Sequence, residues 1–198
     1  MKTSKYAQAM SALLQKPIFR AAEARELGVS SRMLAYYCDQ GAFSRLCRGV
    51  YRVDAVETGL DFSLEDLVLT AVSVPHGTIC LISALCYYEL TDQNMREYWI
   101  AVPNGERSPK RPHAKIIRMR NTALGRTDLI LGGHVIKIFD RERTVCDAFR
   151  YLSHEIAIKA LQNYLKPTHL HKPDLLKLSK YARILRVNLT PYLMALTT

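Results

Sequence analysis

A four-residue link, Gly28-Val29-Ser30-Ser31, constrains the fold of this chain more than any other feature of its sequence. Gly28 can adopt the left-handed backbone conformation that ends a helix, and Val29 can pack between two helices. A serine after them can cap the next helix by accepting a hydrogen bond from its first turn. The sequence therefore predicts one helix over residues 21–27 and a second that begins at Ser30 or Ser31 and ends at Gly41.

A hairpin is predicted to follow this pair of helices. Apolar residues recur through residues 42–53 on either side of Arg48-Gly49, a typical turn sequence, so we expect two short strands. A further helix is predicted over residues 3–15, and residues 18–19 are expected to form a short apolar link. Together these elements predict a winged helix-turn-helix domain over residues 1–56.

The rest of the chain, residues 60–198, is predicted to be a mixed α/β domain with a small sheet packed by helices, which puts the whole chain in the α+β class. Ser63 is expected to cap the first helix of this domain. The predicted helices cover residues 63–74, 78–90, 142–152, 153–165, 174–181 and 190–196. The predicted strands cover residues 98–102, 115–119 and 134–139.

The chain is basic, with 28 Lys and Arg against 18 Asp and Glu and a net charge of +10. The excess is 9 − 5 = +4 over residues 1–60 and 19 − 13 = +6 over residues 61–198. A basic protein without membrane signals is typical of nucleic-acid binders, and a basic solvated surface is the alternative. No apolar run reaches the roughly 18 residues of a membrane span, and the N-terminus lacks the apolar core of a secretory signal, so we expect a cytoplasmic protein.

Basic and hydroxyl side chains around the second predicted helix and the hairpin turn make up the candidate DNA contacts. A guanidinium such as that of Arg32 can reach guanine edges or a phosphate, and serines beside the free N–H groups of a helix start suit phosphate oxygens. Arg45 and Arg48 flank the hairpin tip, where they can enter a minor groove or contact the backbone. An ordinary solvated basic face is the alternative. The full candidate set is Ser30, Ser31, Arg32, Tyr36, Arg45, Arg48 and Arg52.

A second concentration of positive charge lies between residues 104 and 120, in a segment stiffened by prolines. It has no interleaved aromatic residues, so phosphate contact is favoured over base stacking. The segment can extend the DNA footprint, meet an acidic partner surface or be a solvated loop between strands, and the sequence leaves all three open. The additional candidate contacts are Arg107, Lys110, Arg111, Lys115, Arg118 and Arg120.

Patterns of catalytic or metal-binding residues are weak. The acidic residues from Asp140 to Asp147 suggest a metal site, but Arg143 and Asp147 are spaced for an ion pair between successive turns of one helix. The six histidines are dispersed, and no pair among the five cysteines has the CxxC spacing of a zinc site. We therefore expect no enzyme activity, no cofactor and no metal.

Several stretches resemble the AbiEi-type antitoxins, and they occur in the same order as in that family. Residues 19–34 and 41–51, which hold the helix link and the hairpin, resemble its N-terminal domain. The later stretches are residues 79–85, 99–103, 140–147 and 176–193, which resemble in turn a buried S-A-L helix, a central strand, an R-T-x-x-D signature and the C-terminal end. Cys47 departs from the family, in which a small residue or glycine is expected at the wing.

The resemblance implies that the N-terminal domain binds inverted repeats in the promoter of its own operon and represses it. It also implies that the C-terminal domain counters a partner toxin with a nucleotidyltransferase fold, as in the type IV toxin–antitoxin pairs of abortive infection, and needs no cofactor. Two alternatives stay open: a stand-alone protein-interaction module with basic surfaces for an acidic partner, and a generic regulator without a toxin. A nucleic-acid-cleaving enzyme would need clustered acidic residues for a metal, which the sequence does not convincingly supply.

Overall fold

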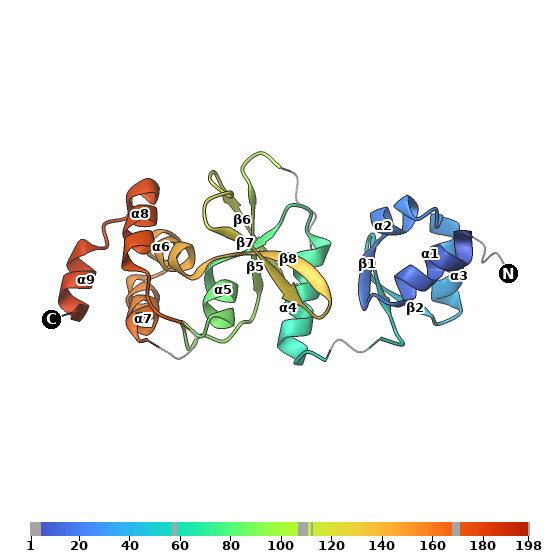
Figure 1. The fold of residues 1–198 in the computed structure, drawn as a ribbon, viewed down its shortest axis with the longest axis horizontal. Helices are drawn as coiled ribbons and strands as arrows, with labels where there is room; N and C mark the ends of the chain where they lie inside the picture. Colours follow the sequence, from blue (N-terminus) through green and yellow to red (C-terminus); the bar gives the residue numbers. More distant parts are fainter. Residues whose placement is uncertain (1–4, 57–58, 107–110, 112, 168–170, 198) are drawn as a thin grey trace. The chain divides into compact units, whose positions relative to one another are not determined.

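A computed structural model of the chain describes residues 5–56, 59–106, 111, 113–167 and 171–197. The fold divides into two compact units, one made of Met1–Pro75 with Leu129–Ile136 and the other of His76–Asp128 with Lys137–Thr198. Helices and two small sheets make up the described chain, which confirms the predicted α+β class (Figure 1). The domain boundary expected between residues 56 and 60 stays a prediction.

The N-terminal unit combines short helices with a three-stranded antiparallel sheet in the order β1-β3-β2. Its helices are α1 (Lys5–Leu14), α2 (Ala21–Glu26), α3 (Ser31–Asp39) and α4 (Phe62–Ser73), and its strands are β1 (Ile18–Arg20), β2 (Phe43–Cys47) and β3 (Val50–Val53). The two helices on either side of the glycine–serine link and the hairpin after them are confirmed. The link expected at residues 18–19 is wrong, because these residues begin β1.

β1 forms by pairing with β3, which lies too far along the chain for local sequence patterns to predict the pairing. Phe19 pairs in register with Tyr51 of β3, and the two rings stack with centroids 5.5 Å apart. The Phe43 and Phe19 rings pack edge to face, with their centroids 5.0 Å apart. These three aromatic residues belong to the hydrophobic core of the N-terminal unit, which also contains residues of α1, α2 and α3.

α4 packs against the same sheet. The Arg20 Nε–H of β1 donates a hydrogen bond to the Val72 carbonyl of α4 at 2.6 Å. The helix begins at Phe62, because the carbonyl of Asp61 accepts the first backbone hydrogen bonds of its opening turn. The prediction that Ser63 caps this helix is therefore wrong: Asp61 is the cap, and Ser63 lies inside the first turn.

The second half of the chain contains a mixed five-stranded sheet in the order β6-β5-β4-β8-β7. β4 is antiparallel to β5 and parallel to β8, and β5 is parallel to β6. The strands are β4 (Thr78–Ile79), β5 (Tyr98–Pro103), β6 (Ala114–Met119), β7 (Arg126–Leu131) and β8 (His134–Phe139). The helices are α5 (Leu81–Tyr87), α6 (Arg141–Tyr151), α7 (His154–Leu165), α8 (Leu175–Leu185) and α9 (Thr190–Thr197).

The three predicted strands and the four predicted helices after residue 140 are confirmed, with some ends shifted. The helix predicted over residues 78–90 is wrong at its start, because residues 78–79 pair with β5 as strand β4 and the helix begins only at Leu81. β7 was not predicted, because its first three residues are polar and exposed and its residues form a strand only beside β8.

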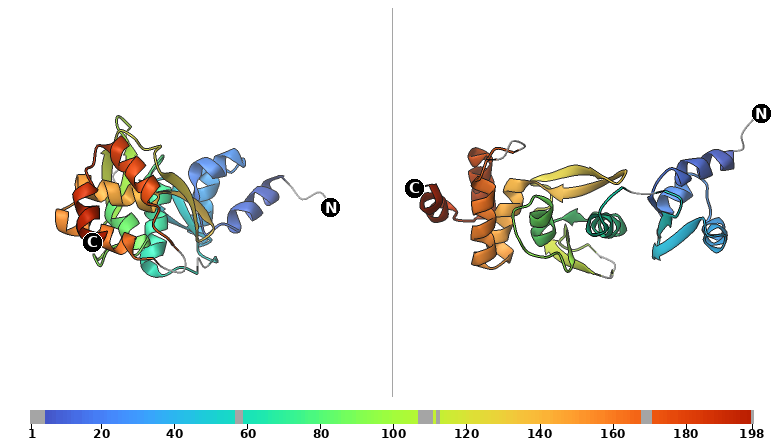
Figure 2. Two further views of the ribbon diagram at one scale, coloured as in Figure 1. Left: turned by 60° about the vertical axis from the view of Figure 1, so that its left-hand side comes forward. Right: turned by 90° about the horizontal axis from the view of Figure 1, so that it is seen from below.

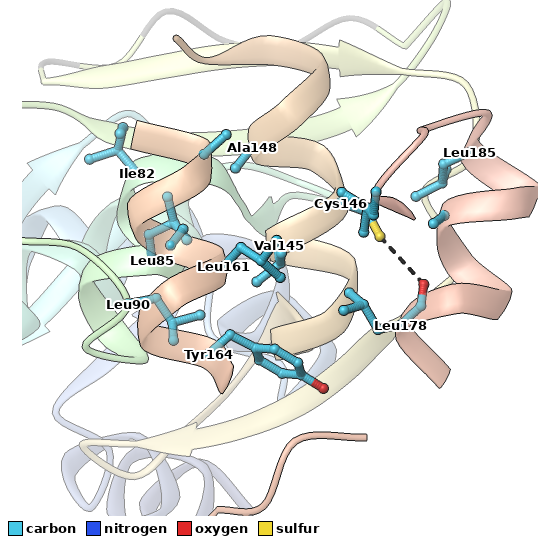
Figure 3. Packing of buried hydrophobic residues seen from close by; sticks show 14 residues of the cluster. Ile82, Leu85, Leu90, Val145, Cys146, Ala148, Leu161, Tyr164, Leu178 and Leu185 are labelled. Atoms are coloured by element: carbon cyan, nitrogen blue, oxygen red, sulfur yellow. Dashed lines mark hydrogen bonds between the residues drawn. The ribbon is translucent and has the colours of Figure 1, made fainter. Parts of the chain in front are cut away.

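The core of the C-terminal unit lies where α6 packs against α5, α7 and α8 (Figure 2). Figure 3 shows Cys146 of α6 among apolar side chains, with its Sγ 3.8 Å from the Leu178 carbonyl oxygen of α8. Burial raises the pKa of the Cys146 thiol to about 12, so this cysteine serves as a small apolar group. Across the described residues, no helix is both long and apolar enough to cross a membrane.

Candidate nucleic-acid interface

The link between α2 and α3 has the conformation that its sequence predicts. Gly28 has a φ of +85°, in the left-handed region that residues with a Cβ disfavour. The N–H groups of Gly28 and Val29 close the end of α2 by donating to its carbonyls, at 2.9 and 2.8 Å. Val29 is 1% exposed and belongs to the N-terminal core. The link therefore fixes the point at which α3 begins.

α3 buries one face and presents the other to solvent. Ser30 is its N-cap, and the Ser30 Oγ accepts a hydrogen bond from the Met33 N–H at 3.3 Å. Leu34 is buried in the core, whereas Arg32 and Tyr36, one turn apart, are exposed. The exposed first half of α3 thus offers a guanidinium, hydroxyl groups and helix N–H groups, a combination that suits phosphates and base edges.

The hairpin turn lies at Arg48-Gly49, as predicted, and Gly49 has a φ of +80°. The register of β2 against β3 shifts between Arg45 and Cys47, so a β-bulge leaves Leu46 without a partner residue on β3. The Gly49 carbonyl accepts a hydrogen bond from the Ala21 N–H at 2.9 Å. The turn is therefore tied to the start of α2.

Sequence reasoning missed Asp54, which fixes the opposite end of the hairpin. The Ser44 hydroxyl of β2 donates to the Asp54 carboxylate, just beyond β3, at 2.8 Å. A serine and an aspartate ten residues apart are not a recognisable pattern, so only the strand register reveals the pair.

Arg45 of β2 lies beside α3. Burial raises the pKa of the Cys38 thiol on α3, and the carboxylates of Asp39 and Asp54 add to that rise. The charge of Arg45 opposes the rise. α3 and β2 also pack against each other. The structure thus makes the first hairpin strand a neighbour of the helix that carries Arg32.

Arg52 has a different environment from the other candidate contacts. Side chains alternate along a strand, so Arg52 lies on the sheet face opposite to that of the buried Tyr51. Its Nη2 is 3.3 Å from Oε1 of Glu65, so the two residues form an ion pair between β3 and α4. Arg52 therefore joins α4 to the sheet.

Six of the seven predicted DNA contacts are exposed, and Arg52 is half-buried. They come from α3 with its N-cap and from the β2–β3 hairpin, which adjoin in the fold. The six exposed residues are Ser30, Ser31, Arg32, Tyr36, Arg45 and Arg48. Their binding to DNA stays a prediction.

The basic segment over residues 104–120 is only partly a loop, because residues 114–119 form β6. The Lys115 Nζ lies 3.8 Å from the centroid of the Trp99 ring and 3.9 Å from a carboxylate oxygen of Glu97. An aromatic ring thus contacts the basic segment, although the sequence of the segment itself contains none. Since Trp99 and Glu97 precede Lys115 by 16 and 18 residues, the parallel pairing of β5 with β6 is needed to predict the contact.

The other predicted contacts of this segment have varied environments. Arg111 is half-buried, and Arg118 and Arg120 are exposed. Arg107 and Lys110 lie outside the described residues. The role of the segment in binding DNA or a partner stays a prediction.

The acidic residues at the start of α6 are bound to internal partners. Asp140 caps the helix by accepting the Arg143 N–H at 2.9 Å. The predicted Arg143–Asp147 ion pair is confirmed, at 2.7 Å between Nε and Oδ2, and it is buried. Burial raises the pKa of the Asp147 carboxyl, and the charges of Arg143 and Arg150 oppose the rise. Within the part of the chain that the structure describes, no three or more His, Cys, Asp or Glu residues are grouped to hold a metal ion.

Comparison with known proteins bears on the N-terminal part of the chain. No curated protein matches the chain. The model of one protein family matches residues 8–53, which extend from within α1 to the end of β3. The later stretches that resemble AbiEi-type antitoxins lie outside the matched residues. The matching family is described as "Transcriptional regulator, AbiEi antitoxin", the family that the helix link and the hairpin resemble in sequence.

Proposed function

We propose that this chain is a transcriptional regulator that binds double-stranded DNA through a winged helix-turn-helix formed by residues 1–56. In this proposal α3 is the recognition helix, which enters the major groove, and the β2–β3 hairpin is the wing. Arg32 and Tyr36 contact bases or phosphates, and Arg45 and Arg48 contact the backbone or the minor groove.

One observation carries the proposal: the basic side chains are exposed on two adjoining elements whose opposite faces are core. Arg32 extends from a helix anchored by the buried Leu34, and Arg45 extends from the strand next to that helix. A buried framework that presents arginines to solvent suits a ligand with many phosphates. The family match over the same residues supports this function.

We further propose that the protein is the antitoxin of a type IV toxin–antitoxin operon of the abortive-infection class. It binds inverted repeats in its own promoter, represses the operon and counters a nucleotidyltransferase-like toxin. The proposal involves no cofactor and no enzymatic step. Its support is the family description, which joins regulation and antitoxin activity.

The main test compares binding of the full chain to duplex DNA from upstream of its own gene and to random duplex of equal length, by fluorescence anisotropy. We expect tighter binding to the upstream DNA and a loss of about tenfold or more in the Arg32→Ala variant, because a base-edge contact contributes about 1–3 kcal/mol. Lys180→Ala, which removes an exposed charge from α8, is the control and should bind like wild type. Equal affinity for both duplexes would contradict sequence-specific repression.

The salt dependence of the same binding reaction tests the role of the hairpin. Each of Arg45→Ala and Arg48→Ala should weaken binding to both duplexes to a similar extent and reduce the slope of log K against log salt by about one. An unchanged slope in both variants would contradict phosphate contact by the hairpin.

The antitoxin proposal is tested by bacterial growth and by a promoter reporter. Co-expression with the neighbouring nucleotidyltransferase-like gene should restore growth, and the chain should repress a reporter behind its own promoter. The variant with Arg32, Arg45 and Arg48 all changed to Ala should lose repression. Full repression by this variant would favour a different surface, and a neighbouring gene product that is harmless to cells would favour a generic regulator.

A further inference from the structure

Arginines from three separate segments line one pocket in the C-terminal unit. The pocket has a volume of about 290 Å³. Arg120 follows β6, Arg150 belongs to α6, and Arg186 follows the last residue of α8. The lining also includes Arg143, whose side chain is fully buried. Four arginine residues therefore line one recess.

The charge around this pocket is not neutralised. Asp147 bonds Arg143 at 2.7 Å and Arg150 at 2.9 Å, so it offsets one of the four positive charges. Neither Arg120 nor Arg186 forms an ion pair with another described residue. The carbonyl end of α8 adds the equivalent of about half a negative charge. The balance stays strongly positive.

Hydrogen-bond donors are also available in the lining. The Oδ1 of Asn121 accepts the Leu124 N–H at 3.2 Å, which leaves the amide NH₂ of Asn121 to donate elsewhere. Arg150 uses Nη1 for Asp147 and has further N–H groups. Arg143 differs, because its Nε and Nη1 are bonded to Asp147 and to the Leu124 carbonyl. Arg143 supplies charge from the interior, and Asn121 and the other three arginines of the lining supply the donors.

We propose that this pocket binds a terminal phosphate group, either of inorganic phosphate or at the end of a small phosphate-bearing molecule. Guanidinium groups bind phosphate oxygens bidentately, and Arg120, Arg150 and Arg186 approach from different segments, as a tetrahedral anion requires. A phosphodiester in duplex DNA lies on a convex surface, with two of its oxygens bonded into the chain. A recess with a buried charge in its lining therefore favours a terminal phosphate, which has three free oxygens.

The test is titration calorimetry of the full chain with inorganic phosphate and with pyrophosphate at constant ionic strength. Wild type should bind phosphate saturably, and the variant Arg120→Gln/Arg186→Gln should bind it about tenfold more weakly or worse, because two charge-assisted contacts are lost. Both residues are exposed, so the variant keeps the fold. The matched control is Arg183→Gln, which removes an exposed charge from the last turn of α8 outside the pocket lining and should bind like wild type.

Three outcomes would overturn the proposal. Wild type could bind no phosphate, or the Arg183→Gln control could lose as much affinity as the double variant, which would indicate general charge attraction. The double variant could also lose affinity for duplex DNA as strongly as for phosphate, which would make the pocket a DNA contact. The DNA-binding proposal is judged separately, because Arg32→Ala should leave phosphate binding unchanged.

Discussion

Arg32 and Arg45 of the N-terminal unit and Arg143 of the C-terminal unit have opposite environments. Arg32 and Arg45 extend into solvent from α3 and β2 of the N-terminal unit. In the C-terminal unit Arg143 is fully buried, and its guanidinium is bonded to Asp147 and to the Leu124 carbonyl. The exposed arginines remain available to a ligand, whereas the buried one is part of the folded interior. The net charge of +10 therefore does not measure a binding surface.

Among the predicted changes in stability, the replacement of the buried Arg143 should be the largest. Arg143→Met leaves the Asp147 carboxylate buried with Arg150 as its remaining bonded arginine, and should lower the free energy of unfolding by about 3–5 kcal/mol. Urea unfolding followed by circular dichroism measures the loss. Arg143→Met/Asp147→Leu removes both charges and should regain much of the stability, since apolar residues can replace a buried pair. If Arg143→Met were as stable as wild type, the result would contradict a role of the Arg143–Asp147 pair in stability.

Two glycines extend the comparison from charge to packing. Gly125 has a φ of +69°, and a Cβ there would lie 2.7 Å from the Arg143 Cβ and 3.0 Å from Oδ1 of Asp140. Gly125→Ala should therefore lower the free energy of unfolding by about 2–4 kcal/mol, from backbone strain and steric overlap together. Gly28 has a φ of +85° with no atom within 4 Å of the added Cβ, so Gly28→Ala should cost only about 1 kcal/mol. Equal losses in urea unfolding would show that packing around Gly125 contributes nothing.

His134 is half-buried, so its environment is intermediate between those of the exposed Arg32 and the buried Arg143. Burial lowers its pKa, Glu23 opposes this, and Lys16 and Arg20 add to the lowering. The unfolded chain, with a histidine pKa of about 6.5, then takes up the proton first as pH falls. This contribution to stability is complete above about pH 6.5 and is lost as pH falls toward the folded pKa. The melting temperature of His134→Gln should decrease less than that of wild type between about pH 7.5 and 5.5; equal decreases would exclude His134 as the cause.

The smallest effect on stability is expected at the exposed arginines. Arg32→Ala, Arg45→Ala and Arg48→Ala should each change the free energy of unfolding by no more than about 0.5 kcal/mol, since exposed substitutions remove few contacts. The same variants should lose affinity for DNA. Replacing Arg32 should therefore lower DNA affinity but hardly change stability, whereas replacing Arg143 should mainly lower stability. A loss of stability above about 2 kcal/mol at Arg32 would remove the distinction between the two regions.

The N-terminal elements could be predicted because their signals are local. Gly28 and Ser30 act within their own turn, and Gly49 marks a two-residue hairpin loop. The strands β1 and β4 could not be predicted, because three and two residues form a strand only against a distant partner. Ile18 and Phe19 illustrate the difficulty, because two adjacent apolar residues are equally compatible with a link and with a strand.

The site in the C-terminal unit shows a different limit of sequence patterns. The four-residue spacing of Arg143 and Asp147 predicts the ion pair, but it predicts neither the burial of the pair nor the hydrogen bond from Arg143 to the Leu124 carbonyl, 19 residues earlier. Arg120 and Arg186 reach the pocket of Arg150 only through the packing of separate segments. No periodicity connects them, and the pocket is visible only in the folded chain.

The grouping of residues 129–136 with the N-terminal unit means that the polypeptide passes from one unit to the other three times, after Pro75, Asp128 and Ile136. A gene segment that ends at residue 75 therefore encodes an incomplete unit. Recombination at one breakpoint would exchange the first part of that unit and leave the tip of the β7–β8 hairpin behind. A chimaera that keeps this unit whole must transplant the hairpin tip along with the N-terminal segment.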